Sequence, residues 1–168
     1  MKEYPTFVTH LECSYTGKTY PADQLHGLSE AGKPLLVRYD LEALGKAISK
    51  DDLKERLPEF WRYREFLPVR KSENVVRLGE LMTPILPAKK IQAKLGCGEI
   101  LIKDEGRLPT GSFKARGIAL AVAMAKELGV TRMAMPTNGN AGAALAAYCS
   151  RADIESFVFC PEDTPKIN

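Results

Sequence analysis

The sequence predicts an α/β fold in which β-α-β units build a parallel sheet, preceded by a small β-containing segment. From Glu99 onward, three apolar runs rich in β-branched and aromatic residues alternate with two stretches of helix-forming residues. Each helical stretch opens on a loop that contains Gly, Ser, Thr or Asn. Strands that alternate with helices imply right-handed crossovers, which place the strands parallel in one sheet.

The amino-terminal residues 1–40 are expected to form a small β segment. Turn residues separate short apolar runs there, and the clearest run is PLLVRYD at 34–40. From Leu41 the apolar positions fall near helical spacing, so residues 41–95 are expected to form a helical connecting region. A β segment therefore precedes a helical one along the chain.

Charged residues and prolines mark where the helices of this connecting region begin and end. Asp51 and Asp52 suit a helix start, whereas Pro58 and Pro68 interrupt the helical pattern. The aromatic side chains between these prolines are expected to pack as a ridge rather than to bind a ligand. An extended piece is expected at 84–87, followed by a brief helix.

Residues 96–168 are expected to form a partial α/β domain. The expected strands span 99–105, 131–136 and 155–161, and the expected helices span 113–128 and 140–151. Parallel sheets bind ligands in the crevice beyond the carboxyl ends of their strands. The loops 105–113 and 137–140 should therefore converge on one site.

Lys114 is the residue of greatest chemical interest. It follows the glycine turn PTGS at 109–112 and falls in the first turn of an expected helix, where acids are normally favoured and backbone amides lack partners. The positive end of the helix dipole and the nearby Arg116 both favour the neutral amine, which can attack a carbonyl carbon. This position predicts Schiff-base chemistry with an aldehyde cofactor, and a solvated surface lysine is the simpler alternative.

A second loop, Thr137 to Gly142, opens a helix composed almost entirely of small residues. The free backbone amides and the dipole of such a helix start face any anion placed before it, and a substrate carboxylate fits this position. Asn138 or Asn140 can instead cap the helix, as asparagine often does. The residue types alone leave both roles open.

Five segments, in a fixed order along the chain, carry a family resemblance. They are WRYREFLPV at 61–69, GELMTPIL at 79–86, IKDEGRLPTGSFKARG at 102–117, PTNGNAGAALAAY at 136–148 and FCPEDTPKIN at 159–168. Together they resemble the pyridoxal-phosphate enzymes of the tryptophan synthase β type and, within that family, the threonine synthases. The resemblance implies the fold of that family, present here only in its amino-terminal part.

The resemblance also implies a cofactor and a reaction. The cofactor is pyridoxal 5′-phosphate, and the reaction converts O-phosphohomoserine and water to threonine and phosphate. By resemblance, Lys114 binds the cofactor and moves protons at the substrate carbons, while Asn140 binds the 3-hydroxyl oxygen of the cofactor. The other implied site residues are Ser112, which orients the lysine, and the substrate ligands Thr137, Asn138, Gly139 and Arg116. Arg116 can alternatively stabilise the local fold.

The length of the chain differs from that of the family it resembles. Threonine synthases are more than twice as long, and their later glycine-rich loop for the cofactor phosphate has no counterpart before Asn168. We therefore expect an amino-terminal fragment, or a non-catalytic fold module derived from such an enzyme. A serine or threonine dehydratase or a cysteine synthase relative is the alternative among enzymes. The exposed sheet edge of such a fragment predicts association of copies.

Composition narrows the classes of partner. The chain has 168 residues, is 45% hydrophobic and 27% charged, and carries a net charge of +3 that is spread along its length. No basic patch argues for nucleic acid or an anionic membrane, so we expect a small-molecule amino-acid substrate. The start has neither a signal-peptide nor a transit-peptide pattern, which predicts a cytoplasmic location.

The cysteines do not predict a metal site. Cys13, Cys97, Cys149 and Cys160 form no C-x-x-C pair and are expected to be reduced thiols. Related threonine synthases often begin with a zinc ribbon of two such pairs, and this chain retains only Cys13 of them. Structural zinc requires four N or S ligands. The amino-terminal segment is therefore expected to be a degenerate ribbon without metal.

Overall fold

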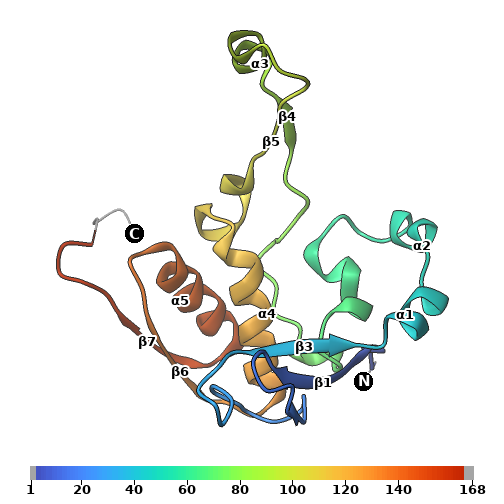
Figure 1. Ribbon diagram of the computed structural model, residues 1–168. Coiled ribbons are helices and arrows are strands. Elements are labelled where there is room, and N and C mark those ends of the chain that lie inside the picture. Colours follow the sequence, from blue (N-terminus) through green and yellow to red (C-terminus); the bar gives the residue numbers. More distant parts are fainter. Residues whose placement is uncertain (1–2, 165–168) are drawn as a thin grey trace. The chain divides into compact units, whose positions relative to one another are not determined.

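The computed structural model describes residues 3–164, so the last four residues of the segment FCPEDTPKIN lie outside the described part of the chain. Figure 1 shows the helices and strands of the described chain. The described chain divides into two compact units, each built from segments that are not consecutive. Unit 1 contains the described residues up to Leu57, Trp61–Val76 and Leu120–Thr131, and unit 2 contains Pro58–Phe60, Arg77–Ala119 and the described residues from Arg132 onward. The predicted division into segments 1–40, 41–95 and 96–168 stays a prediction. The compact units group parts of the chain by contact and so do not test consecutive segments.

Unit 1 begins with a three-stranded antiparallel sheet in the order β2-β1-β3. Strand β1 (Val8–Cys13) pairs with β2 (Thr19–Tyr20) and with β3 (Leu35–Tyr39). The side chains of Val8 and Cys13, at the two ends of β1, are buried. The strands expected in the amino-terminal segment are therefore present.

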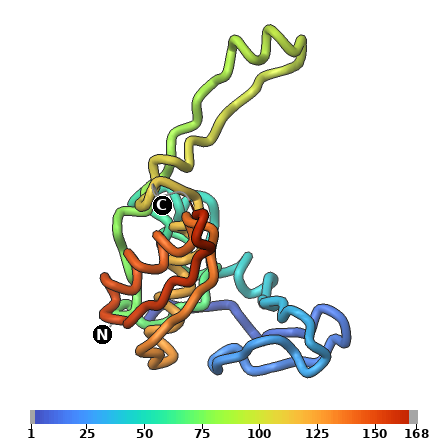
Figure 2. The backbone as a smooth tube through the Cα atoms, turned by 90° about the vertical axis from the view of Figure 1, so that its left-hand side faces the viewer, coloured from blue at the N-terminus to red at the C-terminus, as the bar shows by residue number. Residues whose placement is uncertain are grey.

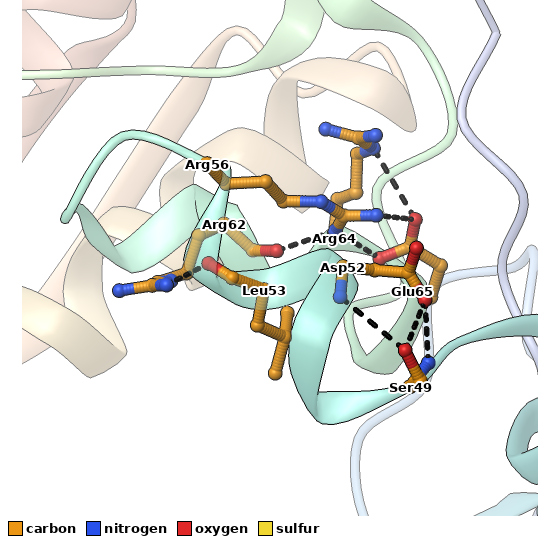
Figure 3. Close-up of polar contacts among 7 residues, drawn as sticks. All are labelled: Ser49, Asp52, Leu53, Arg56, Arg62, Arg64 and Glu65. Carbon is orange, nitrogen blue, oxygen red and sulfur yellow. Dashed lines mark hydrogen bonds and ion pairs between the residues drawn. The ribbon is translucent and has the colours of Figure 1, made fainter.

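Two short helices follow, and both begin at side-chain caps. Asp40 accepts a hydrogen bond at 2.9 Å from a first-turn backbone amide of α1 (Leu41–Ala47). Ser49 and Asp52 form a reciprocal capping box at the start of α2 (Lys50–Lys54), as Figure 3 shows. These caps satisfy amides that have no intrahelical acceptor, which explains why such short helices begin where they do.

The aromatic segment that follows is not α-helical. Phe60–Phe66 forms the 3-10 helix η1, with non-helical backbone angles at Tyr63, and a second short 3-10 helix, η2, spans Ser72–Asn74. Pro58 and Pro68 flank the segment and limit the length of any helix there, and 3-10 turns are common in such short connecting pieces. Trp61 is 3% exposed and donates its indole N–H to the carbonyl oxygen of Val76 at 3.1 Å, which confirms a packing role for this ring.

A buried carboxylate organises the neighbourhood of η1. Arg56 donates from both terminal guanidinium nitrogens to Glu65, at 2.6 and 2.8 Å, and Arg64 lies 3.4 Å from the same carboxylate (Figure 3). Arg56 also donates to the carbonyl oxygen of Arg62 at 2.6 Å. Burial by itself would raise the pKa of Glu65. Hydrogen bonds from Arg56 and the backbone, together with the charges of Arg56 and Arg64, outweigh burial and hold that pKa below its usual value.

Unit 2 contains one parallel β-α-β unit. Strand β6 (Arg132–Pro136) pairs in parallel with β7 (Glu155–Phe159), and helix α5 (Asn140–Ala152) connects them. Leu145, Tyr148 and other α5 side chains are fully buried. These elements match the predicted strands and helix to within two residues, so this part of the predicted α/β fold is confirmed.

The predicted parallel pairing of the first strand of this domain is wrong. Strand β5 (Leu101–Lys103) pairs antiparallel with β4 (Ile85–Pro87), and helix α3 (Lys89–Leu95) lies between them in the chain. Figure 2 shows the backbone running out along β4 and returning along β5. A nearby partner costs little loop entropy to reach, and apolar periodicity does not specify which strand pairs with which.

Helix α4 (Lys114–Glu127) begins in unit 2 and ends in unit 1. Two short 3-10 helices, η3 (Glu105–Arg107) and η4 (Pro109–Gly111), precede it. At its far end, the carboxylate of Glu127 accepts hydrogen bonds at 3.0 Å from the backbone amides of Arg70 and Lys71. The end of α4 is therefore anchored to a loop of unit 1.

We predict that replacing Arg56 with methionine destabilises the protein by about 3–5 kcal/mol, because it leaves a buried carboxylate without its bidentate partner. The side chain of Glu65 is 7% exposed. Urea denaturation of both proteins measures the difference. Lys46→Met is the control, since both partners of its ion pair with Glu42 are exposed, and it should change stability by less than about 1 kcal/mol. Equal effects of the two substitutions would contradict the prediction.

The effect of Arg56→Met should also depend on pH. Folding lowers the pKa of the Glu65 carboxyl below its unfolded value of 4.5. Such a group stabilises the folded protein at pH values above the unfolded pKa, and this stabilisation is lost as the pH falls through the folded pKa. The stability difference between wild type and Arg56→Met should therefore be largest near neutral pH and shrink below pH 4.5.

Candidate functional site

Unit 2 contains a pocket of about 540 Å³ at the start of α5. It is lined by Lys114, Pro136, Thr137, Asn138, Gly139, Asn140 and Ala141. Lys114, which follows the first predicted loop, and residues 137–141 therefore line one cavity. No residue of 105–113 is among the described residues that line it, so the expected convergence of the two loops at parallel strand ends stays a prediction. The volume lies in the range of small-molecule pockets.

Thr137 organises the loop between β6 and α5. Its hydroxyl oxygen accepts hydrogen bonds from the backbone amides of Gly139 at 3.1 Å and Gly142 at 3.2 Å. Its own backbone amide donates to the carbonyl oxygen of Phe159 on β7 at 2.8 Å. Both lone pairs of the hydroxyl are thus used, so the hydroxyl of this pocket-lining residue can make a further hydrogen bond only as a donor.

Neither asparagine of the loop caps α5. The helix is capped at Gly139, whose φ of 139° and ψ of −93° suit glycine, and no side chain accepts a capping hydrogen bond there. Asn140 is the first helical residue, and Asn138 precedes the cap. The capping alternative left open by the sequence is therefore wrong. Both asparagines line the pocket, and neither side chain caps the helix.

The start of α5 packs against its neighbours too closely for any side chain at Gly142. A Cβ atom there would lie 2.5 Å from Cγ2 of Thr137 and 2.6 Å from Cγ1 of Val158 on β7. Contacts below 3.0 Å require the neighbours to shift. Glycine at this position therefore lets the helix start lie directly over the ends of the two parallel strands.

The loop before Lys114 has an unusual backbone. Thr110 and Gly111 both have positive φ angles, 62° and 69°. Positive φ is unfavourable for a β-branched residue such as threonine, so the surrounding structure must hold it. Ser112 is buried, and its hydroxyl accepts from the backbone amide of Lys114 at 3.3 Å, so Ser112 orients the helix start. The Lys114 ammonium lies 4.7 Å from the centre of the Phe113 ring.

Arg116 points to a carboxylate rather than into the pocket lining. Its Nε and Nη2 atoms donate to Glu105, at 2.7 and 3.0 Å. The pKa of Glu105 is lowered to about 2. The hydrogen bonds from Arg116 and Thr83 and the charges of Arg116 and Lys103 together outweigh burial, which by itself would raise it. The nearby Asp104 pairs with Arg107 at 3.0 Å.

A second buried pair supports α5 and was not foreseen. The hydroxyl of Tyr148, which is fully buried, donates to Oε1 of Glu80, and the backbone amide of Leu78 donates to the same oxygen at 2.7 Å. Burial and the hydrogen bond to Glu80 raise the pKa of Tyr148 above its usual range. The two residues are 68 positions apart, so no local pattern could have paired them.

A model of the pyridoxal-phosphate-dependent enzyme family matches residues 76–168, more than half of the chain. The chain belongs to this family. The match includes every residue that lines the pocket. Pyridoxal phosphate is the cofactor of the family, which confirms the cofactor prediction.

Several curated relatives are named threonine synthase. The one from Methanocaldococcus jannaschii is 39% identical over 150 residues, covering 89% of this chain and 37% of the relative. The one from Methanosarcina acetivorans is 35% identical over 153 residues, covering 90% of this chain and 37% of the relative. A third, from Halalkalibacterium halodurans, is 43% identical over 100 residues, 60% of this chain and 28% of the relative. The chain thus spans about 37% of the length of the first two relatives.

The residues around the pocket fit the family cofactor. Lys114 provides a primary amine and Asn140 provides a side-chain amide. The start of α5 provides backbone N–H groups that have no intrahelical acceptor. An amine can hold an aldehyde covalently, and amide donors suit an oxygen anion. Ser112 and Arg116 are not among the described residues that line the pocket, so they touch Lys114 or its helix rather than the cavity.

Candidate metal ligands, thiols and apolar helices are the other features of the described residues 3–164 that bear on function. Between residues 3 and 164, no three His, Cys, Asp or Glu side chains gather closely enough to hold a metal ion. Cys13 is buried, and hydrogen bonds with Ser29 and Thr16 lower the pKa of its thiol to about 6. Within the same residues, no helix is long and apolar enough to cross a bilayer.

We predict that Gly142→Ala destabilises the protein by about 1–3 kcal/mol, because the new methyl group overlaps Thr137 and Val158. Chemical denaturation measures this change. The matched control is Gly117→Ala in α4, where an added Cβ meets no atom within 4 Å. That substitution should stabilise the protein by up to about 1 kcal/mol through helix propensity. A neutral or stabilising Gly142→Ala would contradict the close packing described here.

Proposed function

We propose that this chain is the lysine-bearing part of a threonine synthase. The reaction converts O-phosphohomoserine and water to threonine and phosphate. The observation that carries the proposal is the pocket that joins Lys114 to the loop before α5. The relatives named threonine synthase support the choice of reaction within the family. Because the chain spans about 37% of their length, the activity is proposed for a complete enzyme that contains this chain.

Each residue of the pocket has a role in this proposal. Bound pyridoxal phosphate supplies an electron sink for the substrate carbons. Lys114 would hold the cofactor through its amine and, when released, accept and return protons at those carbons. Asn140 would donate its amide N–H to the cofactor ring oxygen. Ser112 would orient the lysine through the backbone contact at 3.3 Å.

The loop before α5 would bind the substrate carboxylate. Thr137 has only its O–H left to donate, because the backbone amides of Gly139 and Gly142 occupy its lone pairs. Asn138 adds amide donors, and the positive end of the α5 dipole favours an anion at this position. An amino-acid substrate presents such a carboxylate. The loop therefore suits a donor-rich carboxylate site next to the reactive amine.

The substrate role of Arg116 stays a prediction. Two of its nitrogens already donate to Glu105, and a phosphate would have to compete with that carboxylate. The cytoplasmic location and the association of copies likewise stay predictions. The protein carries a small net charge of +3, which favours neither nucleic acid nor membrane.

Lys114→Ala should abolish covalent binding of pyridoxal phosphate. The wild-type chain mixed with the cofactor should turn yellow and, after borohydride reduction, carry the cofactor on the peptide that contains Lys114, as read by mass spectrometry. Lys126→Ala, which removes an exposed amine from the same helix, is the control and should retain both signals. A wild-type protein that stays colourless and unlabelled would indicate a non-catalytic fold module instead.

The substrate choice is tested by phosphate release. The full form of the protein should release inorganic phosphate from O-phosphohomoserine, and Lys114→Ala should lower the rate by several orders of magnitude because the base is lost. Serine, threonine and O-acetylserine are the comparison substrates. Turnover of one of these without phosphate release would favour a dehydratase or a cysteine synthase relative.

A further inference from the structure

Helix α4 begins with an unfavourable distribution of charge. Its first turn contains Lys114 and Arg116 and no acidic residue. The positive end of a helix dipole disfavours cations, and the four first amides of a helix have no intrahelical acceptor. Some group outside the helix must compensate this positive charge for the turn to be stable.

Glu105 is that group. It lies in η3, before the strained loop at Thr110, and its carboxylate accepts from Nε and Nη2 of Arg116 at 2.7 and 3.0 Å. The two side chains are 25% and 26% exposed, so the pair is only partly screened by water. A two-point contact fixes both the distance and the direction of the guanidinium.

The carboxylate of Glu105 is itself held in place from a third segment. The hydroxyl of Thr83, a residue 7% exposed, donates to Oε1 of Glu105. Lys103 lies 3.8 Å from the same oxygen and donates to the carbonyl oxygen of Thr83 at 3.2 Å. The segment that bears Thr83, η3 and the first turn of α4 are thus tied together at one carboxylate.

We propose that Glu105 is a positioning residue that holds the first turn of α4 through Arg116 and thereby directs Lys114 to the pocket. This inference rests on the proposed function, since it assigns a purpose to the placement of that amine. Glu105 touches neither the pocket nor Lys114 in the contacts described, so it acts through another residue. Arg116 accordingly serves the helix start rather than the substrate phosphate.

Amide hydrogen exchange tests the structural half of this inference without cofactor. In Glu105→Gln, the amides of Lys114, Ala115 and Arg116 should exchange about tenfold faster than in wild type, because the first turn loses its counter-charge. The amides in the second half of α4 should not change. Asp104→Asn is the matched control, since its partner Arg107 is 72% exposed, and it should leave all of these rates unchanged.

The double variant Glu105→Gln with Arg116→Gln separates positioning from general stability. If the carboxylate acts only through Arg116, the double variant should exchange no faster than the faster of the two single variants, Glu105→Gln and Arg116→Gln. Independent roles would instead give effects that add. Additive effects, equal acceleration along the whole helix, or unchanged exchange in Glu105→Gln would each overturn the inference.

Cofactor trapping tests the functional half. After incubation with pyridoxal phosphate and borohydride, labelling of Lys114 should fall several-fold in Glu105→Gln and remain at the wild-type level in Asp104→Asn. Equal labelling in wild type and Glu105→Gln would overturn the inference while leaving the proposed function intact. If wild type is not labelled, the proposed function fails, and the exchange experiment alone decides whether Glu105 holds the helix start.

Discussion

The ion pair between Glu105 and Arg116 is the interaction on which the lysine side of the pocket depends. A helix that starts with two cations opposes its own dipole, so its first turn needs a carboxylate from elsewhere in the chain. Glu105 provides this carboxylate, and Thr83 orients it. Unfavourable local charge at the start of α4 is therefore balanced by a tertiary contact, which leaves the amine of Lys114 at the cavity.

The opposite side of the pocket is built in a different way. There the constraint is steric, because Gly142 allows α5 to begin against Thr137 and Val158, and Gly139 adopts backbone angles that other residues avoid. The hydroxyl of Thr137 then satisfies two amides of the turn. One wall of the pocket relies on charge compensation and the other on close packing.

Sequence patterns were sufficient for the elements whose signal is local. The run RMAMP, the small-residue helix from Asn140 and the run ESFVF contain enough periodicity to predict β6, α5 and β7 closely. Local motifs also singled out Lys114 and the loop at 137–140, and these residues line one pocket. Pairing of β5 with β4 was missed, because strand residues that are apolar on both faces specify neither partner nor direction.

By itself, the sequence determined the candidate amine, the loop of amide donors and most helix and strand positions, since these depend on residue type and spacing within short segments. Only the tertiary structure decided that Arg116 pairs with Glu105 and that Glu80 accepts a hydrogen bond from the hydroxyl of Tyr148. It also decided that neither Asn138 nor Asn140 caps α5. These choices depend on which side chains meet after distant segments pack. A buried polar group takes whichever partner the fold brings within hydrogen-bonding distance, and neighbours in the sequence do not reveal that partner.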